Sequence, residues 1–292
     1  FAFGYVAEPN TIYKQVAKLS PGHTLSISLE TPVPHIRQYW DVSYANQTDY
    51  DEKSYQEALI NEFQKSISSH MMAEVPLGSF LSGGVDSSAV VAMMSQESKQ
   101  PVKTCSIGFD VADYNETDFA RMVAKKYQTD HQEKIVASDD FDLLDELAGL
   151  YDEPYADSSS MPTYRVCQLA REKVTVCMSG DGADELLAGY RRYNLMMNEE
   201  KVRSKIPSVL RKAIFKPLGR LYPKLDWAPQ FLRAKTTFQS LAMDSAEGYY
   251  NSMSKLREDE RAGLFSSGFK QSLGGYRAID VYNNALQGKA IG

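Results

Sequence analysis

The sequence predicts an α/β fold in which a parallel β-sheet carries helices on both of its faces. Between residues 74 and 179, short apolar runs alternate with segments of helical periodicity. Strands that alternate with helices of this length are typical of βαβ units, and such units build parallel sheets. A second observation is that small polar residues follow two of the apolar runs, and this end of a strand is where open α/β sheets bind ligands.

The expected elements follow one another in a regular order. Apolar residues at helical spacing predict a first helix over residues 55–72. Beyond it we expect strands over residues 74–82, 102–109, 131–137 and 173–179. We expect the other helices over residues 87–98, 116–127, 141–151 and 162–172. After about residue 190 the strand patterns end, and the remaining sequence is predicted to be helical.

The first part of the chain has a different character. Residues 1–40 show weak alternation, as in "GHTLSISL", interrupted by proline and glycine, which is typical of strands and turns. Residues 41–54 are polar and aromatic without a sustained period, and we interpret them as a linker.

Composition limits the classes of function. The chain has 292 residues, 43% of them hydrophobic and 24% charged, with a net charge of −6 and a pI near 5.4, so nucleic acid is not an expected partner. No apolar run is long enough to span a bilayer, and we expect a soluble, cytoplasmic protein. Cys105, Cys167 and Cys177 lack metal-ligand spacing and are expected to be buried free thiols.

A polar loop, "SGGVDSS", covers Ser82–Ser88 between a predicted strand and a predicted helix. Two glycines allow a tight turn with amides close to an anion, the serines offer hydroxyl donors, and the helix directs its positive end there. Asp86 would repel a phosphate unless a cation lay between them, which predicts Mg²⁺. The alternative is an ordinary strand-to-helix turn in which serine is the N-cap.

A second polar loop follows the last predicted strand. The segment "SGDGADELLAGYRRY", residues 179–193, again begins with Ser-Gly and carries Asp181, Asp184 and Glu185. If the two strands are neighbours, these carboxylates and Asp86 could share a metal ion. The alternative is a solvated acidic helix start. A third polar segment, "DEPYADSSS", contains Asp157 and Ser158, which are candidates either for contact with an amino-acid substrate or for helix N-caps.

Together these segments resemble a known family. "LSGGVDSS" is similar to the PP-loop of ATP pyrophosphatases, and with "CSIGF", "EPYADSSSMPTY" and "SGDGADELLAGYRRY" it resembles the synthetase domain of glutamine-dependent asparagine synthetases. "GYVAEPNTIYKQVAKLSPGHTLSI" and "QYWD" resemble the end of the glutaminase domain and its exit linker. The resemblance implies an adenine nucleotide alpha-hydrolase-like sheet. It also implies a short β remnant of a glutaminase domain at 1–40, a linker at 41–54 and a synthetase domain at 55–292.

The resemblance also implies roles for individual residues. Pyrophosphate of ATP would be bound by Ser82, Gly83, Gly84, Asp86, Ser87 and Ser88. Adenosine would be held by Phe80, Ile107, Ser179 and Gly180. Mg²⁺ would be held by Asp86 and Asp184, and Asp181, where some members carry Glu, would serve the adenylation chemistry. Asn115 departs from the family pattern, which has an aspartate there.

The implied reaction joins aspartate to AMP with release of pyrophosphate, after which ammonia, derived from glutamine in the full-length enzyme, displaces AMP to give asparagine. Two alternatives stay open: a related amidotransferase or β-lactam synthetase that adenylates another carboxylate, and a non-catalytic ATP-binding module. A homodimer is compatible with the resemblance.

The resemblance further implies that the chain is a fragment. The family's glutaminase half uses an N-terminal cysteine as nucleophile, whereas this chain begins with Phe1. The family's downstream lysine and its "LExRxPLLD"-like segment are not found before Gly292, and we assign no catalytic lysine.

Overall fold

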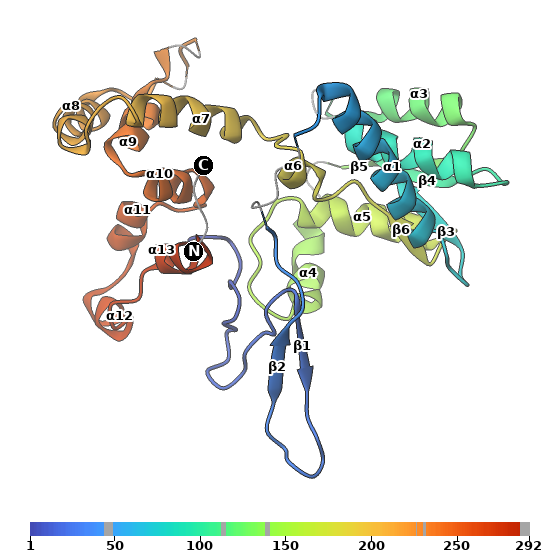
Figure 1. The fold of residues 1–292 in the computed structure, drawn as a ribbon, viewed down its shortest axis with the longest axis horizontal. Coiled ribbons are helices and arrows are strands. Elements are labelled where there is room, and N and C mark those ends of the chain that lie inside the picture. The colour runs from blue at the N-terminus through green and yellow to red at the C-terminus, as the bar shows by residue number, and fades with distance from the viewer. Residues whose placement is uncertain (44–48, 112–114, 138–140, 226, 230–231, 287–292) are drawn as a thin grey trace. The chain divides into compact units, whose positions relative to one another are not determined.

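The computed structural model of the chain forms two compact units (Figure 1). The sheet unit comprises Pro21–Asp152 and Asp157–Leu187, and the helical unit comprises Phe1–Ser20, Glu153–Ala156 and Ala188–Gly292. The structure describes residues 1–43, 49–111, 115–137, 141–225, 227–229 and 232–286.

The sheet unit contains a parallel sheet in the order β5-β4-β3-β6. Its strands are β3 (Leu77–Phe80), β4 (Lys103–Phe109), β5 (Asp130–Val136) and β6 (Val176–Met178). Its helices are α1 (Glu52–His70), α2 (Val85–Glu97), α3 (Thr117–Tyr127), α4 (Leu144–Leu150), α5 (Ser160–Arg171) and α6 (Ala183–Leu186), with a short 3-10 helix at Phe141–Leu143. An antiparallel pair, β1 (His23–Ser26) with β2 (His35–Gln38), belongs to the same unit. The predicted α/β class is therefore confirmed.

Helices cover both faces of this sheet, as predicted (Figure 1). Successive residues of a strand point to opposite faces. Accordingly, Leu81 packs in a cluster with Val91 of α2 and Ala120 of α3, whereas Phe80 packs against Cys105 and Leu169, the latter on α5. The alternation fixes which side chains meet each layer of helices.

Helices α1 and α2 both begin earlier than the sequence pattern predicts. Helix α1 begins inside the segment interpreted as a linker, because the Asp51 carboxylate accepts a hydrogen bond from Ser54 N at 2.8 Å and caps the helix. Helix α2 begins at Val85, so Asp86 lies in its first turn rather than in the loop before it. The apolar pattern misses both first turns, because that of α1 starts with polar, exposed residues and the one apolar residue in that of α2, Val85, is exposed.

The helical unit confirms the prediction of helices after residue 190. Its helices are α7 (Arg191–Arg203), α8 (Ser208–Leu221), α9 (Lys235–Ala242), α10 (Ser245–Met253), α11 (Glu258–Leu264), α12 (Ser267–Ser272) and α13 (Ala278–Leu286). Residues 1–20 belong to the same compact unit, in which Lys255 N donates to Ala2 O at 2.7 Å. The assignment of residues 1–40 to the end of a glutaminase domain stays a prediction.

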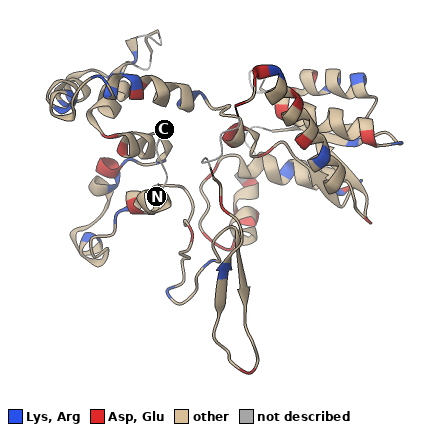
Figure 2. Ribbon diagram, viewed as in Figure 1, with Lys and Arg blue, Asp and Glu red and all other residues tan. Residues whose placement is uncertain are grey.

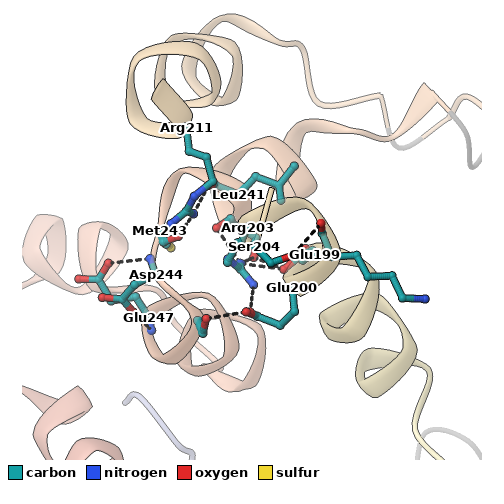
Figure 3. Close-up of polar contacts among 12 residues, drawn as sticks. Glu199, Glu200, Arg203, Ser204, Arg211, Leu241, Met243, Asp244 and Glu247 are labelled. Carbon is teal, nitrogen blue, oxygen red and sulfur yellow. Dashed lines mark hydrogen bonds and ion pairs between the residues drawn. The ribbon is translucent and has the colours of Figure 1, made fainter. Parts of the chain in front are cut away.

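Buried arginines join the helices of this unit (Figure 3). Arg203 of α7 pairs with Glu199 at 3.0 Å and donates to Ser240 O at 2.9 Å. Arg211 of α8 donates from Nη1 to Leu241 O at 2.8 Å and to Met243 O at 2.7 Å. A buried guanidinium needs partners for its donors. Here the carbonyls of the last turn of α9 and of Met243 accept from the Nη atoms, whereas Arg203 Nε has no partner among the described residues.

The cysteines are free thiols, but one expectation about them is wrong. Cys105 is buried and Cys177 is half-buried, whereas Cys167 is exposed. On α5 the inward stripe consists of Val166, Leu169 and Ala170, and Cys167 lies outside that stripe. Among the helices within the described residues, none is both long and apolar enough to cross a membrane.

Candidate nucleotide site

The loop after β3 can be formed only with glycine at position 83. Gly83 has φ +88°, in the left-handed region that L side chains rarely adopt. A Cβ atom on Gly83 would also lie 2.5 Å from Phe119 Cβ and 2.6 Å from Ala120 N, both on α3. The loop therefore lies directly against α3, a contact that no local feature of the sequence indicates.

Two serine hydroxyls hold the loop closed over the start of α2. Ser82 Oγ lies 2.9 Å from Ser87 Oγ and accepts a hydrogen bond from Gly84 N at 3.2 Å. Ser87 Oγ in turn accepts from Ser82 N at 3.2 Å. Both serine hydroxyls are therefore used in hydrogen bonds that stabilise the loop, so ligand contacts at these positions would come mainly from backbone amides.

The N-terminus of α2 has the features of an anion site. Its N-cap is Gly84, which has no side chain with which to cap the helix, and the first intrahelical bond runs from Ser88 N to Gly84 O at 3.0 Å. The amides of residues 85–87 precede that bond, and the helix macrodipole adds positive potential at the same end. Ser88 Oγ is buried without a hydrogen-bond partner among the described residues. A buried hydroxyl in that state suits an additional polar ligand.

The second Ser-Gly loop meets this helix terminus. Strand β6 is the parallel neighbour of β3, with Ser79 paired to Met178, so both loops leave the same edge of the sheet. A Cβ atom on Gly180 would lie 2.8 Å from Ser87 N and 3.0 Å from Asp86 Cβ. The adjacency required by the sequence argument is therefore present, and the two loops are in contact.

The predicted metal ligands lie in two first turns. Asp86 is in the first turn of α2 and Asp184 in the first turn of α6, and both are half-buried, while Asp181 is exposed. Gly182, the N-cap of α6, has φ +88° and makes the turn between Asp181 and Asp184. Within the described residues, no three His, Cys, Asp or Glu side chains form a group that could hold a metal ion. Mg²⁺ at a nucleotide site usually takes one or two carboxylates together with phosphate oxygens and waters, and the Asp86 and Asp184 oxygens fit that donor set.

Two of the predicted adenosine contacts, Phe80 and Ile107, lie on one face of the sheet. The Phe80 ring packs into the cluster beneath α5. Ile107 is two residues beyond Cys105 on β4 and is half-buried, so it belongs to the same face. Because the Phe80 side chain is engaged in the core, any contact it makes with a nucleotide would use its backbone.

Strand β5 carries a half-buried histidine, His131, that sequence reasoning left without a role and that contacts the other face of β4. His131 Nδ1 lies 2.9 Å from Thr104 Oγ1, and Nε2 lies 3.3 Å from Ser106 Oγ. Burial lowers the pKa of His131, a direction opposed by nearby Glu133 and reinforced by Arg121. The neutral imidazole is therefore the form that the fold favours.

The structure of the loop before α5 excludes one of the two roles predicted for Asp157 and Ser158, that of helix N-cap. Asp157 Oδ1 accepts from Ser159 N at 2.9 Å and from Ser159 Oγ at 2.8 Å, and the N-cap of α5 is Ser159. Neither Asp157 nor Ser158 is the N-cap, because the helix begins at Ser160, closer to the loop than the expected residue 162. Contact of Asp157 and Ser158 with a substrate stays a prediction.

Asn115, the departure from the family pattern, accepts a hydrogen bond from Thr117 N at 3.2 Å at the start of α3.

Comparison with known proteins gives a consistent result. The family model described as asparagine synthase matches residues 58–282. The chain is 36% identical over 217 residues to a Methanocaldococcus jannaschii protein named provisionally as glutamine-hydrolyzing asparagine synthetase 2, covering 72% of this chain and 41% of that protein. It is 33% identical over 217 residues to glutamine-hydrolyzing asparagine synthetase 1 of Bacillus subtilis, covering 73% of this chain and 33% of that protein. This chain thus spans well under half the length of both relatives.

A solved structure of an NH3-dependent NAD synthetase from Campylobacter jejuni aligns with a TM-score of 0.31 and 12% identity, covering 68% of this chain and 97% of that one. This likeness is too low to carry an argument. The family match extends over most of the chain, however, and includes both Ser-Gly loops. The chain belongs to the asparagine synthase family.

Proposed function

We propose that this chain binds ATP with Mg²⁺ at the carboxyl edge of β3 and β6 and uses it to activate the side-chain carboxylate of aspartate for amide formation. The observation that carries the proposal is the contact of Gly180 with the amide of Ser87. Through it, the two Ser-Gly loops meet at one helix N-terminus, and Asp86 and Asp184 lie in the first turns that follow these loops. Membership of the asparagine synthase family supports amide synthesis as the reaction class.

In this proposal the pyrophosphate part of ATP lies at the start of α2. The amides of residues 85–87 and the buried Ser88 hydroxyl donate to phosphate oxygens. Gly83 and Gly84 keep side chains out of the approach. Phe80, Ile107, Ser179 and Gly180 contact the adenosine, mainly through backbone atoms.

Asp86 and Asp184 would hold Mg²⁺ through carboxylate oxygens. When bound, the ion neutralises charge on the phosphate oxygens. Fixed amides at a helix N-terminus act in the same direction, because they need no reorganisation as charge builds up on the departing pyrophosphate. Asp181, which is exposed at the loop beside α6, is proposed to orient the substrate for adenylation.

The proposed chemistry has two steps. First, an oxygen of the aspartate side-chain carboxylate attacks the α-phosphorus of ATP, and the bond from that phosphorus to the bridging oxygen breaks, which releases pyrophosphate and leaves aspartyl-AMP. Next, ammonia attacks the acyl carbon, the bond from carbon to the AMP oxygen breaks, and nitrogen loses a proton to solvent. The products are asparagine, AMP and pyrophosphate. Glutamine as the source of ammonia, a homodimeric state and a cytoplasmic location are also proposed rather than tested.

Calorimetric titration of ATP, with and without Mg²⁺, tests the nucleotide site. Asp86→Ala should weaken Mg²⁺-dependent binding by about 100-fold or more, since even outer-shell partners of metals typically contribute roughly 10- to 100-fold. Asp145→Ala is the matched control, because Asp145 is also a first-turn carboxylate of the same unit, although it is exposed where Asp86 is half-buried. Equal ATP binding by the two variants would refute the assignment of Asp86.

Exchange of labelled pyrophosphate into ATP tests the chemistry without requiring ammonia. Exchange that depends on added aspartate is the expected result. ATP binding without exchange in the presence of any carboxylate substrate would favour a non-catalytic module. Exchange with another carboxylate, but not with aspartate, would favour a related synthetase.

A further inference from the structure

The helical unit contains a cavity of about 500 Å³, lined by residues of α8, α9, α10, α11 and α13. Small-molecule sites commonly measure roughly 300–1,000 Å³, so this cavity has the size of a metabolite site. It lies in a different unit from the nucleotide loops and plays no part in the function proposed above.

Basic side chains dominate the cavity. Lys212, Lys216 and Arg220 line it from α8, and their spacing of four residues puts them on one face of the helix, about 6 Å apart along its axis. Figure 2 shows the basic residues of α8 in blue. Arg257 and Arg277 line the same cavity from the residues just before α11 and α13.

Three acidic residues, Glu247, Glu258 and Asp259, also line the cavity. Glu247 belongs to the capping box of α10, and Glu258 lies 3.8 Å from Arg277 Nε. Within the described part of the chain, the three basic side chains of α8 form no ion pair. Five basic and three acidic side chains line the cavity, so its lining carries an excess of positive charge.

The wall of the cavity is rigidly built. Arg257 Nη1 donates to Gln239 Oε1 at 2.7 Å, and Gln239 Nε2 donates to Gly219 O at 3.3 Å. A Cβ on Gly219 would lie 2.8 Å from Gln239 Cγ, so α8 and α9 are in close contact there. Behind this wall, buried Arg211 holds the carbonyl of Met243, another lining residue, at 2.7 Å (Figure 3). The basic groups therefore project from a scaffold fixed before any ligand binds.

We propose that this cavity is a second ligand site, which binds a small multivalent anion bearing phosphate or carboxylate groups. Two anionic groups separated by about 6 Å would each meet one cation of α8. The concave shape and limited volume favour a metabolite over an acidic protein segment, which would need a larger surface.

Calorimetric titrations at low ionic strength, each with one probe, test the proposal. The probes are fructose 1,6-bisphosphate for phosphate groups, citrate for carboxylate groups and inorganic phosphate for a single group. At least one of the two multivalent probes should bind with a Kd below about 1 mM, and binding should weaken with added salt. Lys212→Gln/Lys216→Gln should weaken that binding about tenfold or more, equivalent to about 1.4 kcal/mol.

The matched control is Lys99→Gln/Lys125→Gln, which removes two exposed charges from the sheet unit and should leave the affinity unchanged. Thermal unfolding of each variant checks that it is folded. The proposal is overturned if neither multivalent probe binds, if both double variants behave alike, or if saturating ATP displaces the probe. Binding of poly-glutamate without binding of either multivalent probe would also overturn it and would indicate a protein partner.

Discussion

Replacing Gly180 by alanine tests the close contact between the two loops without removing a charged or hydroxyl group from the site. The new Cβ would lie 2.8 Å from Ser87 N and 3.0 Å from both the carbonyl carbon and the Cβ of Asp86. None of these atoms belongs to the far end of a flexible side chain, so the loop or the helix terminus must move. Overpacking of this kind costs roughly 1–3 kcal/mol, which for a unit of this size lowers the melting temperature by roughly 2 to 12 °C.

The same displacement should weaken Mg²⁺-dependent ATP binding by about tenfold, close to the loss of one charge-assisted hydrogen bond. Differential scanning calorimetry and ATP titration measure the two effects on one sample. Gly149→Ala is the control, because a Cβ there meets nothing within 4 Å and alanine favours the helix α4. An unchanged melting temperature would refute the contact, and an unchanged ATP affinity would refute its place in the site.

Further predictions concern the buried groups of each unit. Arg211→Met should lower the stability of the helical unit by roughly 3 kcal/mol and expose α9 to hydrogen exchange, because buried carbonyls lose their donor. Lys205→Met, at an exposed position, should leave the exchange of α9 unchanged. Equal exchange in the two variants would contradict the role of Arg211. Because burial lowers the pKa of His131, its stabilising contribution is present above the unfolded pKa of about 6.5 and is lost as pH falls toward the folded pKa. Urea unfolding between pH 7 and 5 should therefore show a smaller loss of stability in His131→Gln than in the wild type, and parallel losses would contradict this reading.

Local patterns were sufficient for the order of strands and helices and for both Ser-Gly loops. Apolar runs of strand length between helical segments have one common arrangement, a parallel sheet with helices on both faces. The first turns of α1 and α2 were missed, since caps such as Asp51 act through one hydrogen bond and leave no apolar periodicity. The exposure of Cys167 was also missed, because two neighbouring positions of a helix can lie inside and outside its buried stripe.

The sequence by itself determined the class of fold, the family resemblance and the residue types able to bind phosphate and a divalent cation. Only the tertiary structure decided which of those residues meet. The contact of Gly180 with Ser87 depends on β6 pairing with β3, and the fit of Gly83 depends on the position of α3. The cavity beside α8 likewise depends on how α8 and α9 pack. Such contacts join residues distant in the chain, and their energies come from close packing, which no local pattern encodes.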